Sequence, residues 1–287
     1  WRGIITACGL LMIIITLAIG AFLCYKGVGT FTTYGHSVGE FLFSSQWAPA
    51  DNAQGGGKVG AAIFIFGSII TCALALLIST PFSIASAIFM TEISPGIGRK
   101  ILQPAVEIFV GIPSVVYGWI GLTILVPFIK DLFDLKFGFS VLAAGIVLAV
   151  MIYPTITSLS ADAIRSIPKS FRQASYGLGA TRWQTISQVV IPASKSGLMT
   201  AIVLGLARAF GEALAVAMVI GKMKAFPESL LSPTTNLTAA IASDMGGAME
   251  GSEYNIALWS MALLLFIISL VFIFIIHYIS AKGGHKA

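Results

Sequence analysis

The chain has 287 residues, of which 57% are hydrophobic and only 10% are charged, and its mean hydropathy is +0.93. A water-soluble globule of this length needs more polar surface, so the composition excludes an ordinary soluble protein and indicates an integral membrane protein. We attribute the net charge of +5 to orientation in the bilayer rather than to nucleic-acid binding, because many basic residues lie in short loops between apolar segments.

Apolar segments of membrane-spanning length define the predicted fold. A spanning helix needs roughly 20 mainly apolar residues. Six segments come close to this length: 4–25, 61–84, 105–128, 140–159, 197–220 and 256–280. The middle four contain Gly, Ser, Thr, Pro and charged residues, so we expect them to form the packed interior. The sequence therefore predicts an all-α membrane protein with about six transmembrane helices in a single domain, 1–287.

The distribution of charge predicts the orientation. If the N-terminus is cytoplasmic, the inside loops carry Arg99, Lys100, Arg165, Lys169, Arg172, Arg182, Lys195, Lys282 and Lys286, and the outside loops carry more acidic than basic residues. The positive-inside rule then places both termini in the cytoplasm. The chain begins at Trp1 rather than at methionine, so we expect further residues before it. We expect no cleavable signal, because Ile4–Tyr25 is long enough to span.

The third segment contains a predicted helix break beside polar side chains. Pro113 lies between two glycines in the run Gly111–Gly118, which predicts a bend or an opening of the helix. Ser114 and Tyr117 would offer hydroxyl groups to a passing solute, and Glu107 is expected to be a buried acid near the start of the segment. The alternative interpretation is a packing kink with a hydrated Glu107.

Residues 160–196 form a long polar connection, which we call the coupling loop. Its pattern predicts two short helices joined by a glycine hinge that includes Gly179. Two Ser or Thr residues each precede a glutamine by three positions, which predicts capping boxes: Ser170 with Gln173, and Thr181 with Gln184. The apolar side chain of Trp183 in this polar segment indicates that the loop inserts into another protein.

The fifth apolar segment contains two charged residues, Arg208 and Glu212. A charge at membrane depth costs at least about 2.5–3.5 kcal/mol, so such residues usually face an interior cavity and have a function. Four residues apart on one helix, the two side chains share a face and can pair. They either lock helices together as a neutralising pair, or Arg208 binds a passing anion through its planar donors. Glu212 would then accept a hydrogen bond from protonated phosphate, a donor that sulfate lacks.

Several kinds of chemistry have no signature in this sequence. There is no GxxxxGK[ST] phosphate-binding loop, no hydrolytic triad and no metal cluster, and the three cysteines lack metal or redox spacing. We therefore expect no catalytic residues, no metal and no cofactor bound by this chain. Transport driven by ATP would need an ATPase in another chain.

The coupling loop resembles the cytoplasmic signature of permease subunits of bacterial ABC importers. That signature reads roughly Glu-Ala-Ala, then Gly, then an Ile-x-Leu-Pro-like ending, and here the matching runs are Gln173-Ala-Ser175, Gly179-Ala-Thr181 and Val190-Ile-Pro192. Gln173 replaces the acid of the signature, so no salt bridge is expected from that position.

Over nearly its whole length the chain resembles the phosphate-specific (Pst) permeases, within the binding-protein-dependent transport system inner membrane component family. Four stretches carry the resemblance: Phe41-Leu through Trp47-Ala-Pro49, Ala87-Ile-Phe-Met-Thr-Glu92, Glu107 through Gly118, and Gly205-Leu-Ala-Arg-Ala-Phe-Gly-Glu212. The following run, Ala213–Gly221, resembles the PstC-type subunit more than its PstA-type sister.

The resemblance implies a MetI-like ABC permease fold with a cytoplasmic coupling helix, in the bacterial plasma (inner) membrane. It implies a PstA-type sister permease, two PstB-type subunits that use ATP and Mg, and a PstS-type extracytoplasmic phosphate-binding protein. Arg208 and Glu212 match the family's charged pair implicated in phosphate passage. The residues that match the ATPase-coupling loop are Gln173, Ala174, Gly179, Ala180, Thr181 and Trp183.

We therefore expect half of an alternating-access pathway for phosphate, coupled to separate ATPase subunits. Three alternatives remain open at this stage. The first is a permease of the same architecture for another oxyanion, such as sulfate or molybdate. The second is a secondary transporter or channel that uses Arg208 and Glu212 as an ion or proton relay. The third is a membrane scaffold or sensor without transport activity.

Overall fold

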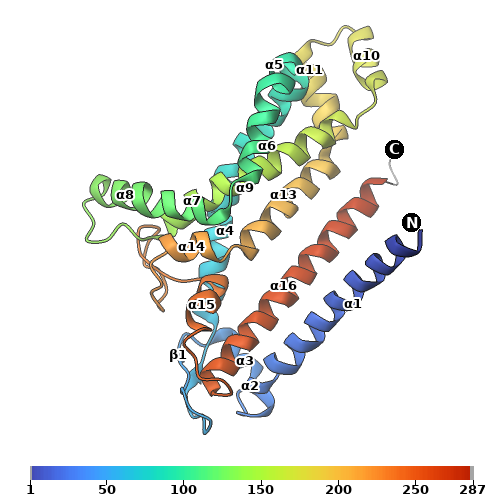
Figure 1. The fold of residues 1–287 in the computed structure, drawn as a ribbon. Helices are drawn as coiled ribbons and strands as arrows, with labels where there is room; N and C mark the ends of the chain where they lie inside the picture. The colour runs from blue at the N-terminus through green and yellow to red at the C-terminus, as the bar shows by residue number, and fades with distance from the viewer. Residues whose placement is uncertain (1, 285–287) are drawn as a thin grey trace. The chain divides into compact units, whose positions relative to one another are not determined.

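A computed structural model describes residues 2–284, so Trp1 and the predicted inside residue Lys286 lie outside the described residues. The described chain is built mainly of helices (Figure 1). Its strands are the two-residue β1 (Trp47–Ala48) and β2 (Lys58–Val59), which pair antiparallel with Trp47 opposite Val59. The predicted all-α class is confirmed.

Helices of spanning length account for most of the described chain. Five are long and apolar enough to cross a membrane, and a sixth candidate is a pair of helices bent by 67°. Four predicted segments correspond to single long helices: α1 (Arg2–Gly27), α4 (Ala62–Ile88), α9 (Val141–Arg165) and α16 (Glu253–Gly284). The bent pair joins Arg182–Ala193 to Lys195–Gly211. The prediction of about six spans agrees with this count.

Two predicted segments are not continuous helices: the opening predicted at Pro113 is present, and a second break, which was not predicted, lies at Glu212. Segment 105–128 is divided into α6 (Gln103–Gly111), α7 (Ser114–Ile120), η3 (Gly121–Leu125) and α8 (Val126–Leu132). The first break occurs because Ile112 is extended (ψ 127°) and Pro113 has no N–H to continue the helix. Segment 197–220 is divided into α13 (Lys195–Gly211) and α14 (Leu214–Val219), because Glu212 is extended (ψ 120°).

The described chain divides into two compact units. Unit 1 contains the residues up to Ser68 together with Lys222–Phe226 and Thr234–Ile268, and unit 2 contains most of the remainder, chiefly Ile69–Gly221. Unit 1 includes the short helices α2 (Gly29–Thr32), α3 (Val38–Phe43) and α15 (Leu237–Asp244).

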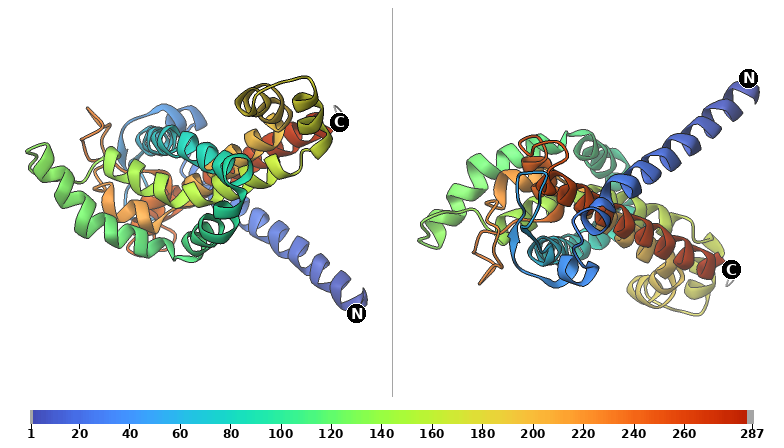
Figure 2. Two further views of the ribbon diagram at one scale, coloured as in Figure 1. Left: turned by 90° about the horizontal axis from the view of Figure 1, so that it is seen from above. Right: turned by 90° about the horizontal axis from the view of Figure 1, so that it is seen from below.

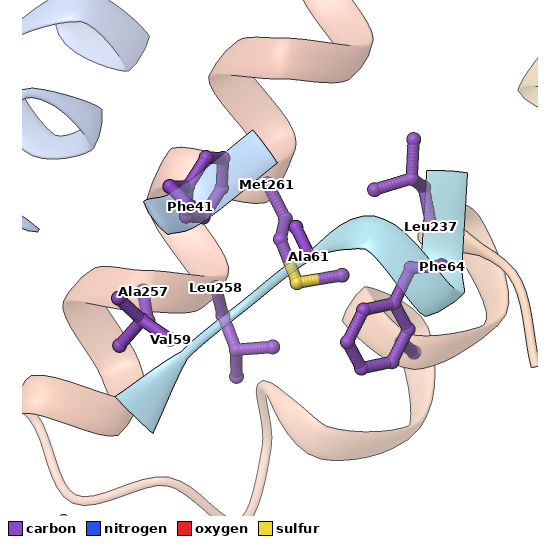
Figure 3. Close-up of a cluster of buried hydrophobic side chains, with 9 residues drawn as sticks. Phe41, Val59, Ala61, Phe64, Leu237, Ala257, Leu258 and Met261 are labelled. Carbon is purple, nitrogen blue, oxygen red and sulfur yellow. The ribbon is translucent and has the colours of Figure 1, made fainter. Parts of the chain in front are cut away.

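The core of unit 1 joins segments that are far apart in the sequence. Phe41, Phe64 and Met261 are fully or almost fully buried, and Figure 3 shows them converging with Val59, Ala61, Leu237, Ala257 and Leu258. Burial of such side chains contributes roughly 1.5–3 kcal/mol each. The predicted outer loop after α1 therefore supplies core residues of this unit.

Unit 2 is built around α9, which is buried along much of its length. Helix α13 packs on α9 so closely that a Cβ added at Gly205 would lie 2.5 Å from Ile156. One end carries η1 (Phe89–Ile93), α5 (Pro95–Ile97), η2 (Gly98–Leu102), α10 (Lys169–Gly177), α11 (Arg182–Thr185), η4 (Ile186–Val190) and α12 (Ile191–Ala193). Helices α7, α8 and α14 lie at the other end (Figures 1 and 2).

Candidate functional site

Arg208 lies in the interior of unit 2, near the C-terminal end of α13. It is partly buried, and its Nη1 donates a hydrogen bond to the hydroxyl of Thr155 at 2.7 Å. Tyr117 lies within electrostatic range of Arg208, without a hydrogen bond between them in the described chain. A guanidinium has five N–H donors, and within the described part of the chain the bond to Thr155 is the hydrogen bond that Arg208 makes. Most of its donor capacity is therefore unused.

Tyr117 connects this arginine to the break in the third segment. Its hydroxyl donates to the carbonyl oxygen of Phe109 at 2.8 Å and so satisfies an acceptor near the end of α6. Next to it, Gly118 allows α7 to approach α14, because an added Cβ would lie 2.7 Å from Cα of Ala215. The structure thus brings predicted Tyr117 and Arg208 together, while the partly buried Ser114 begins α7 at the break itself.

Glu212 occupies a different position from the one that its spacing predicted. Helix α13 ends at Gly211, so Glu212 is the residue that follows the helix rather than part of a continuous span, and its carboxylate bonds to the next helix. Glu212 is partly buried, and its Oε1 accepts a hydrogen bond from the backbone N–H of Ala215 at 3.0 Å. The carboxylate therefore caps the start of α14 and holds the second helix break in place.

Glu107 does not join this group. It is exposed on α6, where its Oε1 accepts a hydrogen bond from the Gln103 side chain at 3.0 Å, so the expectation of a buried acid was wrong. Its segment is interrupted at Pro113, which leaves Glu107 on the short α6, away from the α7–α14 contact.

The two helix breaks and Arg208 together form the candidate site. Helices α7 and α14, which pack on each other, both begin directly after a break, and both also contact α9. Irregular backbone at membrane depth is tolerated where it is buried in protein or lines a water-filled cavity. Transporters commonly build their substrate sites from such discontinuous helices. The arrangement can bind an anion through Arg208 while Tyr117 and Thr155 supply neutral hydroxyls.

The coupling loop contains the two predicted short helices, α10 and α11, with Gly179 between them at φ +81°. The predicted capping box at Thr181 is present: the N–H of Gln184 donates to the Thr181 hydroxyl at 3.3 Å, and the N–H of Thr181 donates to Gln184 Oε1 at 2.8 Å. The box predicted at Ser170 is absent, because α10 begins at Lys169 directly after Pro168.

Apolar side chains of the coupling loop are unusually exposed. Leu178 is 90% exposed and Trp183 is 65% exposed. The other residues predicted to contact an ATPase are also accessible, at least in part: Gln173, Ala174, Gly179, Ala180 and Thr181. Exposed large apolar side chains next to polar ones are typical of a surface that binds another protein.

Sequence reasoning missed a partly buried ion pair at the base of the coupling loop. Arg172 donates to both carboxylate oxygens of Glu92, with Nη2 at 2.5 Å and Nε at 3.1 and 3.2 Å. It also donates to the carbonyl oxygens of Ile164 and Ile167 at the C-terminal end of α9. Arg182 Nη2 donates to the backbone carbonyl oxygens of Glu92 and Ile93. These bonds attach both helices of the coupling loop to η1, and α10 also to the end of α9.

A second missed group lies in unit 1 around Glu253, which is almost fully buried. Its carboxylate is 2.7 Å from Nε2 of His36 and accepts backbone N–H bonds from Ala50, Gly56 and Gly57 at 2.7–3.2 Å. His36 also contacts Glu40 at 3.4 Å. We call this group the Glu253 cluster. It fixes the glycine-rich loop, and its only sequence signals were an isolated acid and three consecutive glycines.

Comparisons with known proteins agree on one class. A family model described as the binding-protein-dependent transport system inner membrane component matches residues 79–283. The chain is 54% identical to a probable ABC transporter permease protein, YqgH, of Bacillus subtilis, over 98% of the chain and 90% of that protein. It is 35% identical to the phosphate transport system permease protein PstC of Haemophilus influenzae, over 92% of the chain and 87% of that protein.

Two solved structures show a similar fold. A chain of a bacterial ABC transporter involved in the import of the acidic polysaccharide alginate has a TM-score of 0.59 and 18% identity, covering 100% of this chain and 97% of that one. A chain of the inward-facing MetNI methionine ABC transporter has a TM-score of 0.56 and 20% identity, covering 76% of this chain and 96% of that one. At these identities the similarity concerns the fold alone.

Proposed function

The chain belongs to the family of binding-protein-dependent transport system inner membrane components, and from this premise we propose that it is a permease subunit of an ATP-driven phosphate importer. Family and fold together make the chain an ABC importer permease and a multi-pass membrane protein. The proposal adds phosphate as the solute. PstC relatives at 35–36% identity over most of the chain support this choice.

The main support for the proposal is that Arg208 is charged, partly buried and bonded to only one neutral hydroxyl in the described chain. A permanent positive charge in the interior of unit 2, with one hydrogen bond to a neutral hydroxyl, is a costly arrangement unless an anion completes it. A guanidinium presents two parallel N–H donors to a tetrahedral oxyanion, and such charge-assisted bonds are about twice as strong as neutral ones. Phosphate passing the helix breaks would supply the missing acceptors.

Glu212 supports the choice of phosphate over sulfate. At neutral pH phosphate still carries a proton, whereas sulfate carries none. A carboxylate near the break can accept a hydrogen bond from that proton, in addition to capping α14. A Glu212→Gln variant should lose selectivity for phosphate over sulfate, and unchanged phosphate uptake with unchanged selectivity would count against this role.

We propose alternating access as the mechanism. Partner PstB-type ATPases bind ATP and Mg, and their closure pushes on Leu178 and Trp183, the exposed apolar residues of the coupling loop. Arg172 passes this movement to Glu92 and to the end of α9. Because α9 also carries Thr155, the same movement changes the surroundings of Arg208.

The remaining partners follow from the same proposal. A PstA-type sister permease would complete the pathway, and a PstS-type extracytoplasmic protein would deliver phosphate. Both termini would be cytoplasmic, which places α10 and α11 on the side of the ATPases. This chain would itself bind neither ATP nor a metal.

The decisive experiment is uptake into vesicles that contain the purified complex. We expect phosphate uptake that requires ATP and is not inhibited by an excess of sulfate or molybdate. Equal uptake of sulfate would retain the permease and overturn phosphate as its solute. Uptake driven by a proton gradient without ATP would identify a secondary transporter, and no uptake of any oxyanion with an intact complex would overturn the proposal.

A further inference from the structure

A cavity of about 540 Å³ lies at the end of unit 2 that carries the coupling loop. Four of its lining residues are basic and one is acidic: Arg99, Arg165, Lys169, Arg172 and Glu92. We call it the basic cavity. Its volume is within the range of about 300–1,000 Å³ that is typical of small-molecule sites.

The single carboxylate does not neutralise the basic cavity, because both oxygens of Glu92 are bound by Arg172. Within the described residues, the side chains of Arg99 and Lys169 have no hydrogen-bond or ion-pair partner. Arg165 has only exposed contacts, to Asp162 at 3.4 Å and to the Gln103 side chain at 3.1 Å. Three cationic side chains on different elements therefore surround one space, and in the described part of the chain only Arg165 has an acidic partner, the exposed Asp162.

A further acid, Glu107, lies beside the basic cavity. Arg99 and Arg165 also line an adjoining cavity of about 450 Å³ that contains Glu107. Glu107 accepts a hydrogen bond from the amide of Gln103, whose oxygen accepts one from Arg165. Gln103 thus separates the acid from the arginine, and Arg165 keeps donors for a further acceptor.

The basic cavity lies at the level where two spans end. The apolar spans Ala62–Ile93 and Val141–Arg165 both finish among its lining residues. Its other lining residues include apolar ones, Met90, Pro95 and Ile167. The protein therefore presents positive side chains beside an apolar surface at the level of the lipid headgroups. Such an arrangement is typical of sites that bind anionic lipids.

We propose that the basic cavity is a binding site for a phosphate group, held by Arg99, Arg165 and Lys169. The group is either the headgroup phosphate of an anionic phospholipid or free inorganic phosphate. Arg99 belongs to η2 and Lys169 begins α10, so the bound group bridges the coupling loop to the span ends. The inference goes beyond the proposed function, because it requires neither uptake nor ATP hydrolysis.

Lipid binding to the purified complex in detergent tests the site. The probes are phosphatidylglycerol, phosphatidylcholine and inorganic phosphate at constant ionic strength, and the readouts are bound lipid in native mass spectra and the midpoint of thermal unfolding. The test variant is Arg99→Gln with Lys169→Gln, and each single variant gives a graded control. Lys130→Gln with Lys136→Gln removes the same charge from exposed positions elsewhere in unit 2.

We expect phosphatidylglycerol to bind the native complex and to raise the unfolding midpoint, with phosphatidylcholine inactive. The test variant should bind at least about tenfold more weakly, the loss expected for one charge-assisted hydrogen bond, and the Lys130/Lys136 variant should bind normally. Binding of inorganic phosphate alone, lost in the same variant, would identify free phosphate as the ligand. If the native complex and all variants bind phosphatidylglycerol equally, and also bind inorganic phosphate equally, the proposed site is wrong.

Discussion

Arg172 and Arg208 are both partly buried arginines of unit 2, yet their surroundings are opposite. Arg172 makes three hydrogen bonds to Glu92 and two to backbone carbonyls. Arg208 makes one, to the neutral hydroxyl of Thr155. A saturated arginine gains nothing from a ligand and serves to hold elements together. We propose that Arg208, whose donors are mostly unused, binds an anion, so burial of charge alone does not distinguish the two roles.

The largest effect on stability is expected from replacing Arg172, whose donors are occupied by Glu92 and by backbone carbonyls. Arg172→Ala removes three hydrogen bonds to Glu92 and two to backbone carbonyls, and since a hydrogen bond to a charged group is worth about 1.5–3 kcal/mol, we expect a loss of about 3 kcal/mol or more. Thermal unfolding of the purified complex measures this. The control is Lys130→Ala, which removes one positive charge from an exposed position and should change stability by under about 0.5 kcal/mol. Equal destabilisation by the two variants would refute the structural role of Arg172.

The next effect concerns the partner of the unsaturated arginine. Thr155→Val removes the hydrogen bond to a charged group, which is worth about 1.5–3 kcal/mol. We expect phosphate uptake to fall roughly tenfold with little change in assembly. Thr123→Val is the control, because that hydroxyl donates only to a carbonyl of its own helical segment. If both variants reduce uptake equally, Thr155 does not position Arg208.

A smaller effect is expected where α7 meets α14. Gly118→Ala places a Cβ 2.7 Å from the backbone of Ala215, and such overpacking costs typically about 1–3 kcal/mol. Unfolding midpoints and uptake should both decrease. Gly111→Ala, which meets nothing within 4 Å, should change the packing little. Wild-type behaviour of Gly118→Ala would show that close contact between α7 and α14 is not required.

The smallest effect is a pH dependence of unit 1. Burial lowers the pKa of His36, but its hydrogen bonds to Glu253 and Glu40 outweigh this and raise the pKa above its ordinary 6.5. The protonated form therefore stabilises the fold fully below about pH 6.5, and this contribution is lost as pH rises through the raised pKa. Unfolding midpoints between pH 6 and 9 should fall in the native chain and stay flat in His36→Gln. His277→Gln, which alters an exposed histidine, should retain the native slope.

The spans could be predicted because bilayer thickness fixes the length of an apolar helix. The break at Pro113 had a local signal, since proline lacks an N–H. The break at Glu212 had only the weak signal of Gly211, because a single glycine is tolerated inside a helix. It is formed by the contact of α14 with α7 and by the cap on Ala215.

Parts of the site could be predicted because they have a local signal in the sequence. The capping box at Thr181 depends on residues three apart, and Arg208 stood out as a charge in an apolar segment. The pairs Glu92–Arg172 and His36–Glu253 are 80 and 217 residues apart, and Thr155 is one of several hydroxyl-bearing residues in α9, with nothing local to single it out. Only tertiary packing brings these groups together, so no local pattern could reveal them.

We propose that the partly buried Arg208 binds the transported anion. The most direct test compares ATP-dependent phosphate uptake by the native complex and by its Arg208→Gln variant. A third variant, Arg208→Lys, keeps the positive charge but loses the two parallel N–H donors of the guanidinium. We predict a loss of at least about tenfold for Arg208→Gln, with normal assembly and thermal stability, and an intermediate rate for Arg208→Lys. Undiminished uptake by Arg208→Gln would contradict the account and leave Arg208 as a structural charge.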